Sequence, residues 1–173
     1  MEATKAQADR LARPEKQPVQ KVLVIVSKGT IEDVYAGLIM ANGALMEGIE
    51  AKMFFTFFGM DAIRKERQDK LHTATVGNPA MMSKVPTMIA GLPGMETLAS
   101  AMMKKEMDKL DIPPVSEFLD MIVAGGGEIY ACQLAAEMFH LSEEDFIEDL
   151  SGIITVGDMY GLADGEGTQI IFI

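Results

Sequence analysis

Cys132 is the only cysteine of the sequence and the side chain best suited to nucleophilic chemistry. It lies between residues 128–131, which predict a short strand, and residues 133–139, which predict a helix. In open α/β sheets the carboxyl ends of the strands face the ligand crevice. The N-terminus of a helix carries partial positive charge, which favours a thiolate over a thiol. The pattern therefore predicts a reactive sulfur at a strand–helix junction, mostly ionised near neutral pH.

Two other roles remain open for Cys132. A lone cysteine is most often a small buried hydrophobe, which would make the protein a non-catalytic binding or scaffold protein. A single cysteine can also carry out thiol redox chemistry. The three roles leave different products, because sulfur transfer leaves a persulfide, redox chemistry leaves a sulfenic acid, and a structural cysteine leaves neither.

Any charge partner of Cys132 must come through space, because no cationic residue lies near it in the sequence. Lys28 is the best candidate. It lies in the turn of residues 27–30, after the first expected strand, and parallel strands present such turns on one edge of the sheet. The alternative is an ordinary solvated lysine. Tyr130 either orients or shields the sulfur, or is a core-facing aromatic residue.

Neither glycine-rich nor acidic segments predict a cofactor. Residues 125–127 are three glycines that precede a strand, whereas a phosphate-binding glycine loop follows one. The acidic residues Asp158, Asp164 and Glu166 lack the spacing of a calcium loop. A single cysteine also excludes a cysteine-rich zinc site and an intramolecular disulfide. We therefore expect neither a cofactor nor a metal.

The charge of the chain is negative and unevenly distributed. The net charge is −11, and beyond Lys109 there is no Lys or Arg, against 13 Asp and Glu residues. Such an acidic half repels phosphate backbones, which argues against nucleic acid as a partner. No apolar run approaches the roughly 20 residues that a membrane helix needs, and the first 21 residues lack the apolar core of a signal peptide. We expect a cytoplasmic protein without a membrane span.

The order of apolar segments predicts an α/β domain. The expected strands are residues 21–26, 52–58, 128–131, 152–156 and 168–173. The expected helices are residues 30–47, 61–71, 95–110, 115–124 and 133–139. Strands that alternate with helices indicate a three-layer α/β/α sandwich around a mainly parallel sheet of about five strands.

Two segments are expected to lie outside this regular pattern. Residues 1–20 are polar and predict a flexible N-terminal tail before the domain of residues 21–173. Residues 72–111 form an irregular insertion rich in methionine and proline. Its methionines either pack it against the domain or make it a mobile flap or docking surface. Within it, the expected helix turns Leu98, Met102 and Leu110 inward.

Three segments resemble the DsrE/DsrF-like family, in the branch often labelled peroxiredoxin-like. They are Ser27-Lys28-Gly29-Thr30 after the first strand, Phe54-Phe55-Thr56-Phe57-Phe58-Gly59 at the second, and Ile129-Tyr130-Ala131-Cys132-Gln133. The resemblance covers about residues 21–173. It implies a Rossmann-like α/β/α fold, a trimer or hexamer, and a cysteine at this junction that carries sulfane sulfur. It also implies TusA-like or rhodanese-like sulfur-transfer partners.

The chain departs from some relatives, which have a second cysteine or a transmembrane segment. A relay between two cysteines of one subunit is therefore excluded. The label peroxiredoxin-like also lacks support, because Ile129 stands where a Thr-x-x-Cys site needs threonine.

We expect a sulfur carrier or sulfurtransferase-like protein, a relay rather than a turnover enzyme. Cys132 would act as the nucleophile, and the expected binding residues are Lys28, Gly29, Thr30, Tyr130 and Gln133.

Overall fold

The computed structural model describes residues 18–74 and 94–173. Most of the expected tail, residues 1–20, and the middle of the expected insertion, residues 72–111, therefore lie outside the described residues. At the start of the described chain, Gln20 is already tied to the sheet, since its N–H donates to the Gly167 carbonyl and its carbonyl accepts from the Glu50 N–H.

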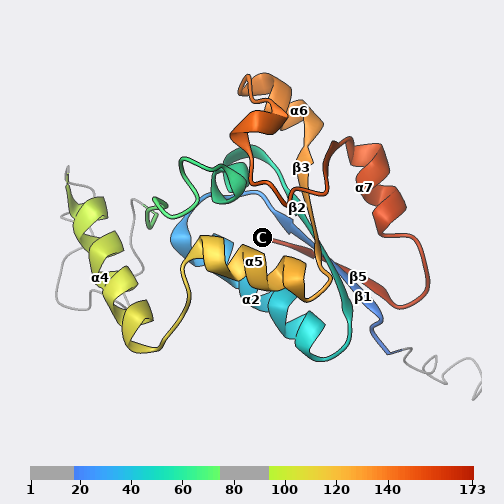
Figure 1. Cartoon of the computed structure of the whole chain (residues 1–173), viewed down its shortest axis with the longest axis horizontal. Coiled ribbons are helices and arrows are strands. Elements are labelled where there is room, and N and C mark those ends of the chain that lie inside the picture. Colours follow the sequence, from blue (N-terminus) through green and yellow to red (C-terminus); the bar gives the residue numbers. More distant parts are fainter. Residues whose placement is uncertain (1–17, 75–93) are drawn as a thin grey trace, which may run out of the picture.

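Five parallel strands form one sheet in the order β4-β3-β2-β1-β5 (Figure 1). The strands are β1 (Lys21–Val26), β2 (Glu50–Phe55), β3 (Glu128–Cys132), β4 (Gly152–Ile154) and β5 (Thr168–Phe172). The α-helices are α2 (Ile31–Met46), α4 (Met95–Lys109), α5 (Val115–Ala124), α6 (Gln133–Met138) and α7 (Val156–Leu162). Two 3₁₀ helices, η1 (Phe57–Ile63) and η2 (Glu143–Asp145), complete the described elements. The expected three-layer α/β/α fold with a parallel sheet is confirmed.

Helices cover both faces of the sheet. Gly37 of α2 packs on Val24 and Val26 of β1, and α5 lies beside α2. Lys21 points to the opposite face, because side chains alternate along a strand, and its ammonium donates to the Leu162 carbonyl at the end of α7. The helices α2 and α5 therefore form one outer layer, and α7 belongs to the other.

The inner strand β1 is buried because it has a neighbouring strand on each side and helices on both faces. Leu23, Val24 and Val26 are completely buried. Burying an aliphatic side chain of this size contributes roughly 1.5–3 kcal/mol. The apolar run that predicted a buried parallel strand is thus explained by its place between β2 and β5.

The second strand is shorter than expected. It ends at Phe55, and Phe57 and Phe58 lie in η1 with 49% and 67% of their surface exposed. The chain turns because the Gly59 N–H donates to the carbonyls of Thr56 and Ser27. The expectation of a strand through Phe58 was wrong, since these hydrogen bonds fold the chain back before the apolar run is finished.

The expected helix over residues 61–71 is also wrong. The 3₁₀ helix η1 ends at Ile63, and Arg64 forms an isolated antiparallel bridge with Phe146. Single turns follow, in which the N–H groups of Arg67 and Gln68 both donate to the Arg64 carbonyl. Pairing with a distant segment therefore replaces the helical hydrogen bonds that the charged sequence suggested.

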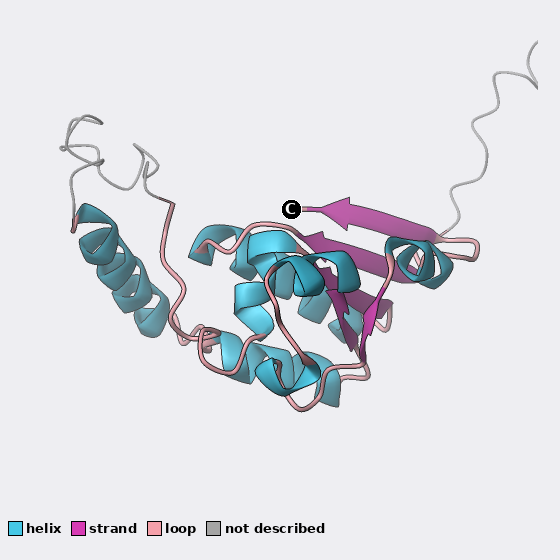
Figure 2. Ribbon diagram, turned by 90° about the horizontal axis from the view of Figure 1, so that it is seen from above, coloured by secondary structure: helices cyan, strands magenta, loops and turns pink. Residues whose placement is uncertain are grey.

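The expected helix over residues 95–110 is present as α4, but its orientation is not the expected one. Leu98, Met102 and Leu110 are 51%, 48% and 72% exposed. Met103 and Met107 instead pack against the core. The helix stands apart from the sheet in both views (Figures 1 and 2). Among the described residues, no helix is long and apolar enough to cross a bilayer.

Two glycines hold the turn after β1 against the turn after β2. A methyl group at Gly29 would collide with the backbone carbonyl of Phe58, and one at Gly59 would collide with the carbonyl of Val26. Backbone atoms cannot move aside as flexible side chains do. The two turns can therefore approach this closely only where a side chain is absent.

We predict that Gly29→Ala lowers the free energy of unfolding by about 2 kcal/mol, because the backbone must separate to admit the methyl group. Gly43→Ala is the matched control, since Gly43 lies inside α2 with open space around it. Alanine there should stabilise the protein by about 0.5–1 kcal/mol through its helix propensity. Urea unfolding of the three proteins measures both effects. Equal stabilities of Gly29→Ala and the wild type would contradict the close approach of the two turns.

Candidate functional site

Cys132 lies at the strand–helix junction that the sequence predicted. It is the last residue of β3 and the N-cap of α6, and it pairs with Ile154 of β4. Its side chain is buried, with 4% of the residue surface exposed. The position agrees with the expectation, and the burial means that a reagent must displace protein atoms to reach the sulfur.

Strand register places the turn after β2 beside Cys132. Phe55 of β2 pairs with Ala131 of β3, so Thr56 lies next to Cys132 across the strands. Val26 of β1 pairs with Phe55, which places Ser27 one strand further along the same edge. The carboxyl ends of β1, β2 and β3 therefore meet at one edge, as parallel strands require.

The helix that follows Cys132 is short. It is six residues long, and Ala135 and Ala136 are its buried side chains. Leu134 and Met138 are 67% and 50% exposed. The electrostatic influence of a helix acts within its first turn, where Cys132 lies.

Lys28 does not lie on the strand next to Cys132. Its ammonium forms an ion pair with Asp33 at 3.2 Å, and its side chain is 63% exposed. The strand β2 separates β1 from β3, a spacing of roughly 10 Å between the outer two strand axes. The structure thus places Lys28 with Asp33, in a solvated setting.

Thr30 closes the same turn. Its hydroxyl donates to the Asp33 carboxylate at 2.6 Å, so Asp33 receives both Thr30 and Lys28. Gly29 contacts the Phe58 backbone, as described above. Lys28, Gly29 and Thr30, which were expected to bind a ligand, therefore also form the turn that packs against η1.

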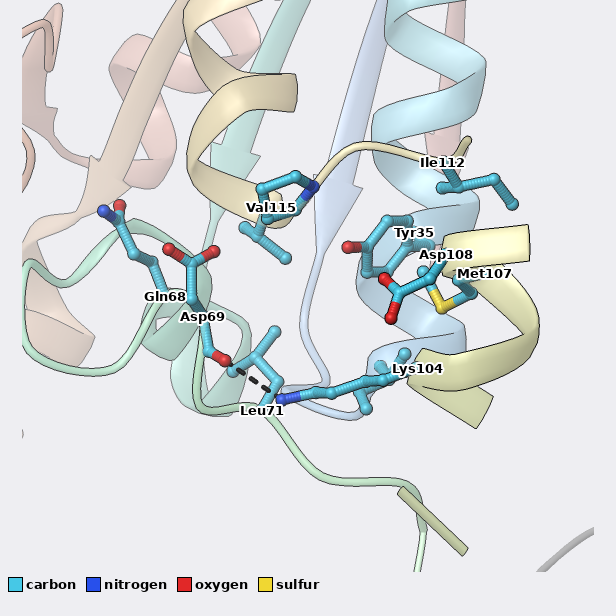
Figure 3. A pocket seen from close by; sticks show the side chains of 11 residues that line it. Tyr35, Gln68, Asp69, Leu71, Lys104, Met107, Asp108, Ile112 and Val115 are labelled. Carbon is cyan, nitrogen blue, oxygen red and sulfur yellow. Dashed lines mark hydrogen bonds between the residues drawn. The ribbon is translucent and has the colours of Figure 1, made fainter. Parts of the chain in front are cut away.

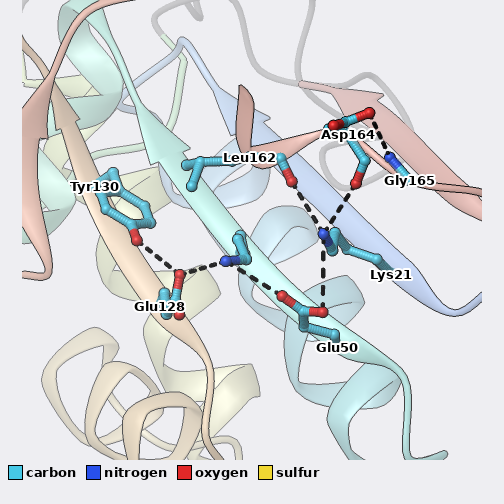
Figure 4. Close-up of polar contacts among 8 residues, drawn as sticks. Lys21, Glu50, Glu128, Tyr130, Leu162, Asp164 and Gly165 are labelled. Atoms are coloured by element: carbon cyan, nitrogen blue, oxygen red, sulfur yellow. Dashed lines mark hydrogen bonds and ion pairs between the residues drawn. The ribbon is translucent and has the colours of Figure 1, made fainter. Parts of the chain in front are cut away.

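Tyr130 lies on the same face of β3 as Cys132, two residues before it. Its hydroxyl donates to the Glu128 carboxylate at 2.7 Å, and the Lys52 ammonium donates to the same oxygen at 2.7 Å (Figure 4). The phenol oxygen is therefore held toward Glu128, near the start of β3, whereas Cys132 lies at its end. Gln133 is exposed, and its amide donates to Glu137 one turn along α6.

The contacts of this network perturb the pKa values of its members. Hydrogen bonds from Lys52 and then from Tyr130 hold the pKa of Glu128 below its usual range. Burial tends to lower the pKa of Lys52, but hydrogen bonds to Glu128 and Glu50 outweigh it, so the pKa is raised. Burial and the hydrogen bond to Glu128 raise the pKa of Tyr130. The network is therefore ionised as a lysine–carboxylate pair with a neutral phenol at neutral pH.

A cavity of about 300 Å³ opens at the edge where Cys132 lies. Its lining includes Phe57, Phe58, Phe139, Asp61, Arg64 and Arg67. Sequence reasoning missed these residues because it assigned Phe57 and Phe58 to a strand and the arginines to a solvated helix. The β-bridge between Arg64 and Phe146 joins residues far apart in the sequence. This cavity therefore could not be predicted from a local sequence pattern.

A second cavity, of about 280 Å³, lies between α2, α4 and the segment before Leu71 (Figure 3). Tyr35 lines it, and burial together with the charges of Asp69 and Asp108 raises the pKa of Tyr35 to about 12. Lys104 spans from α4 to the Asp69 carbonyl at 3.0 Å. Cys132 lines neither of these two cavities. Within the described chain, no group of three or more His, Cys, Asp or Glu side chains is placed to hold a metal ion.

Comparison with known proteins gives one family and a consistent fold. Residues 18–170 match the DsrE/DsrF/DrsH-like family. The sulfur carrier protein DsrE2 of Allochromatium vinosum is 30% identical over 135 residues, which cover 75% of this chain and 84% of that protein.

Two solved structures share the fold at low sequence identity. The MTH1491 protein of Methanobacterium thermoautotrophicum superposes with a TM-score of 0.54 at 8% identity, over 88% of this chain and 98% of its own. The ychN protein of E. coli gives a TM-score of 0.54 at 10% identity, over 90% of this chain and 100% of its own.

We predict that Glu128→Gln lowers the free energy of unfolding by about 1 kcal/mol at pH 7, because the glutamine loses the charge-assisted hydrogen bond of Lys52. Since the folded pKa of Glu128 is depressed, its contribution is present above the unfolded pKa and disappears as pH falls through the folded value. The stabilities of variant and wild type should therefore converge in acid. Urea unfolding between pH 7 and pH 3 measures the difference.

Glu148→Gln is the control for this prediction, because it makes the same change of charge at an exposed position. A difference between Glu128→Gln and the wild type that stays constant down to pH 3 would contradict the ion pair.

Proposed function

The chain belongs to the DsrE/DsrF/DrsH-like family, and on this basis we propose that it is a sulfur carrier that holds sulfane sulfur on Cys132 and passes it to a partner. The observation that carries the proposal is the place of Cys132. It is the single cysteine of the chain, and it ends a strand at the edge where parallel sheets bind ligands. The resemblance of Tyr130-Ala131-Cys132-Gln133 to the family supports the same residue.

The chemistry is an exchange of one sulfur–sulfur bond for another. The Cys132 thiolate attacks the outer sulfur of a donor persulfide, a new S–S bond forms, and the donor leaves as a thiolate. The acceptor repeats the step in reverse, with its own thiolate attacking the outer sulfur on Cys132. No net oxidation occurs, so one cysteine is sufficient for a relay.

Burial of Cys132 is compatible with this role. A bound sulfur extends the side chain by one S–S bond of about 2.05 Å. The transferable sulfur therefore lies beyond the cysteine sulfur, and burial protects the thiol of the empty carrier.

A relay needs other proteins, and we propose TusA-like or rhodanese-like partners in the cytoplasm. A homo-oligomer, such as a trimer or hexamer, is supported by the edge strand β5. Ile170 and Phe172 on this strand are 46% and 70% exposed. An exposed apolar edge is a surface that proteins usually cover.

The 4% exposure of Cys132 also favours a second candidate, a non-catalytic binding or scaffold protein with a structural cysteine. Buried cysteines without a charge partner are generally inert. In that case Cys132 would belong to the core with Ala131 and Ala135, which are equally buried.

We predict that incubation with polysulfide or thiosulfate adds sulfur to the wild-type protein and leaves Cys132→Ala unchanged. Intact mass spectrometry should show a gain of about 32 Da for a persulfide, and dithiothreitol should remove it. A parallel incubation with peroxide separates redox chemistry, which leaves a sulfenic acid. A thiol that stays unmodified by every donor, and that iodoacetamide labels only after denaturation, would favour the scaffold protein.

A further inference from the structure

We propose that the cavity of about 300 Å³ between η1 and the end of α6 binds a small organic anion, and that this anion is the tail of the donor that loads Cys132. We call it the Arg–Phe cavity, after Arg64, Arg67, Phe57, Phe58 and Phe139 in its lining. The assignment of the anion to a sulfur donor rests on the proposed function of Cys132. The anion site itself rests on the cavity alone.

Positive charge is in excess in the wall of the Arg–Phe cavity. Arg64 binds one oxygen of Asp61 at 3.0 Å, and Arg67 binds the other at 3.1 Å. Among the lining residues, two guanidinium groups therefore share one carboxylate, which leaves one positive charge in the wall, and the Asp145 carboxylate outside the lining also interacts with Arg64. Each guanidinium has five N–H donors, of which Asp61 occupies only a part. An anion in the cavity meets both charge and donors.

Arg64 also has a hydrogen bond to gain. Its Nε–H is buried and lacks a hydrogen-bond partner among the described residues. A buried donor without a partner costs roughly 1–3 kcal/mol. Because Arg64 lines the cavity, an anion there meets a guanidinium whose donors are not all used within the described chain.

The remaining walls of the cavity are apolar and select an organic ligand over an inorganic ion. The rings of Phe58 and Phe139 contact each other with centroids 5.9 Å apart. Phe57 is held with a positive φ of 46°, a conformation that costs about 1–3 kcal/mol for a residue of this type, and its side chain is 49% exposed. Aromatic walls with a few placed charges are typical of pockets for small organic molecules.

The cavity lies near the edge of the sheet where β2 and β3 end, and Cys132 is not among its lining residues. Thr56 lies beside Cys132 by strand register, and Phe57 is the next residue, one Cα step of about 3.8 Å further. Phe139 is the C-cap of α6, at the opposite end of that helix from its N-cap Cys132. A ligand held between these walls lies at the edge of the sheet where the sulfur must arrive.

The donor class that fits is a small organic persulfide with a carboxylate, R–S–SH. The Cys132 thiolate attacks the outer sulfur, the bond between the two donor sulfurs breaks, and R–S⁻ leaves. The transferred sulfur keeps its proton, so the products are the Cys132 persulfide and the donor thiolate. The carboxylate bound at Arg64 and Arg67 takes no part in the bond changes.

The anion site is tested with an unreactive probe, N-acetyl-S-methylcysteine, and with its amide as the neutral probe. NMR titration of Cys132→Ala should show binding of the carboxylate probe and binding at least about tenfold weaker for the amide. Arg67→Gln in the same background should weaken the carboxylate probe about tenfold. Arg67 is the residue to change because its side chain is 55% exposed, so the fold tolerates the change.

Lys65→Gln is the matched control. This change removes one positive charge at a position that lies between Arg64 and Arg67 in the sequence. Lys65 lines a different cavity. It should change binding less than about twofold, since exposed charges at a distance are screened. Equal losses in Lys65→Gln and Arg67→Gln, or equal binding of the acid and the amide, would overturn the anion site.

The donor role is tested by the rate at which Cys132 is loaded. N-acetylcysteine persulfide should load the wild type about tenfold faster than the persulfide of its amide, and Arg67→Gln should remove this preference. Inorganic polysulfide should load both proteins equally. A loading rate that depends neither on the donor carboxylate nor on Arg67 would overturn the donor role. The proposed sulfur-carrier function would not be affected. If the probe binds but no donor loads Cys132, the proposed function fails and the anion site stands.

Discussion

The pairing of β1 with a parallel strand on each side is the constraint on which the rest of this structure depends. Lys21 to Val26 pair in register with Glu50 to Phe55 on one side, and with β5 on the other. Parallel register fixes where every neighbouring strand ends, and therefore where every turn begins. The position of Cys132 follows from this register through β2, without a direct contact between β1 and β3.

The close approach of the turns after β1 and β2 determines which side chains are exposed at this edge of the sheet. Gly29 and Gly59 allow backbone to pack on backbone, which holds η1 across the ends of β1 and β2. The consequence is that Phe57 and Phe58 project outward instead of continuing the strand. Lys28 and Lys52 each pair with acidic residues, whereas Arg64 and Arg67 share the Asp61 carboxylate. The lining of the Arg–Phe cavity thus carries more positive than negative charge in a protein whose net charge is −11.

The sequence predicts the parts of the structure that are decided locally. The run of residues 21–26 is apolar and β-branched, and it is a buried strand. Cys132 follows a strand and precedes helix-forming residues, and it lies at that junction. The prediction failed where distant contacts decide the conformation, since Arg64 pairs with Phe146 inside the segment that was expected to be a helix over residues 61–71. The expected orientation of α4 was also wrong, because Met103 and Met107 pack against the core while Leu98 and Met102 are exposed.

Burial and reactivity of Cys132 conflict only if the end of β3 is rigid. The residues after Cys132 form a helix of six residues, and isolated helices of this length are not stable without tertiary contacts. Two buried alanines anchor it, and they bury little apolar surface compared with leucine or phenylalanine. We expect local opening of α6 to cost less than global unfolding, because the sheet below keeps its register. A buried thiol at the base of a weakly anchored helix can be protected most of the time and still exchange sulfur when the helix opens.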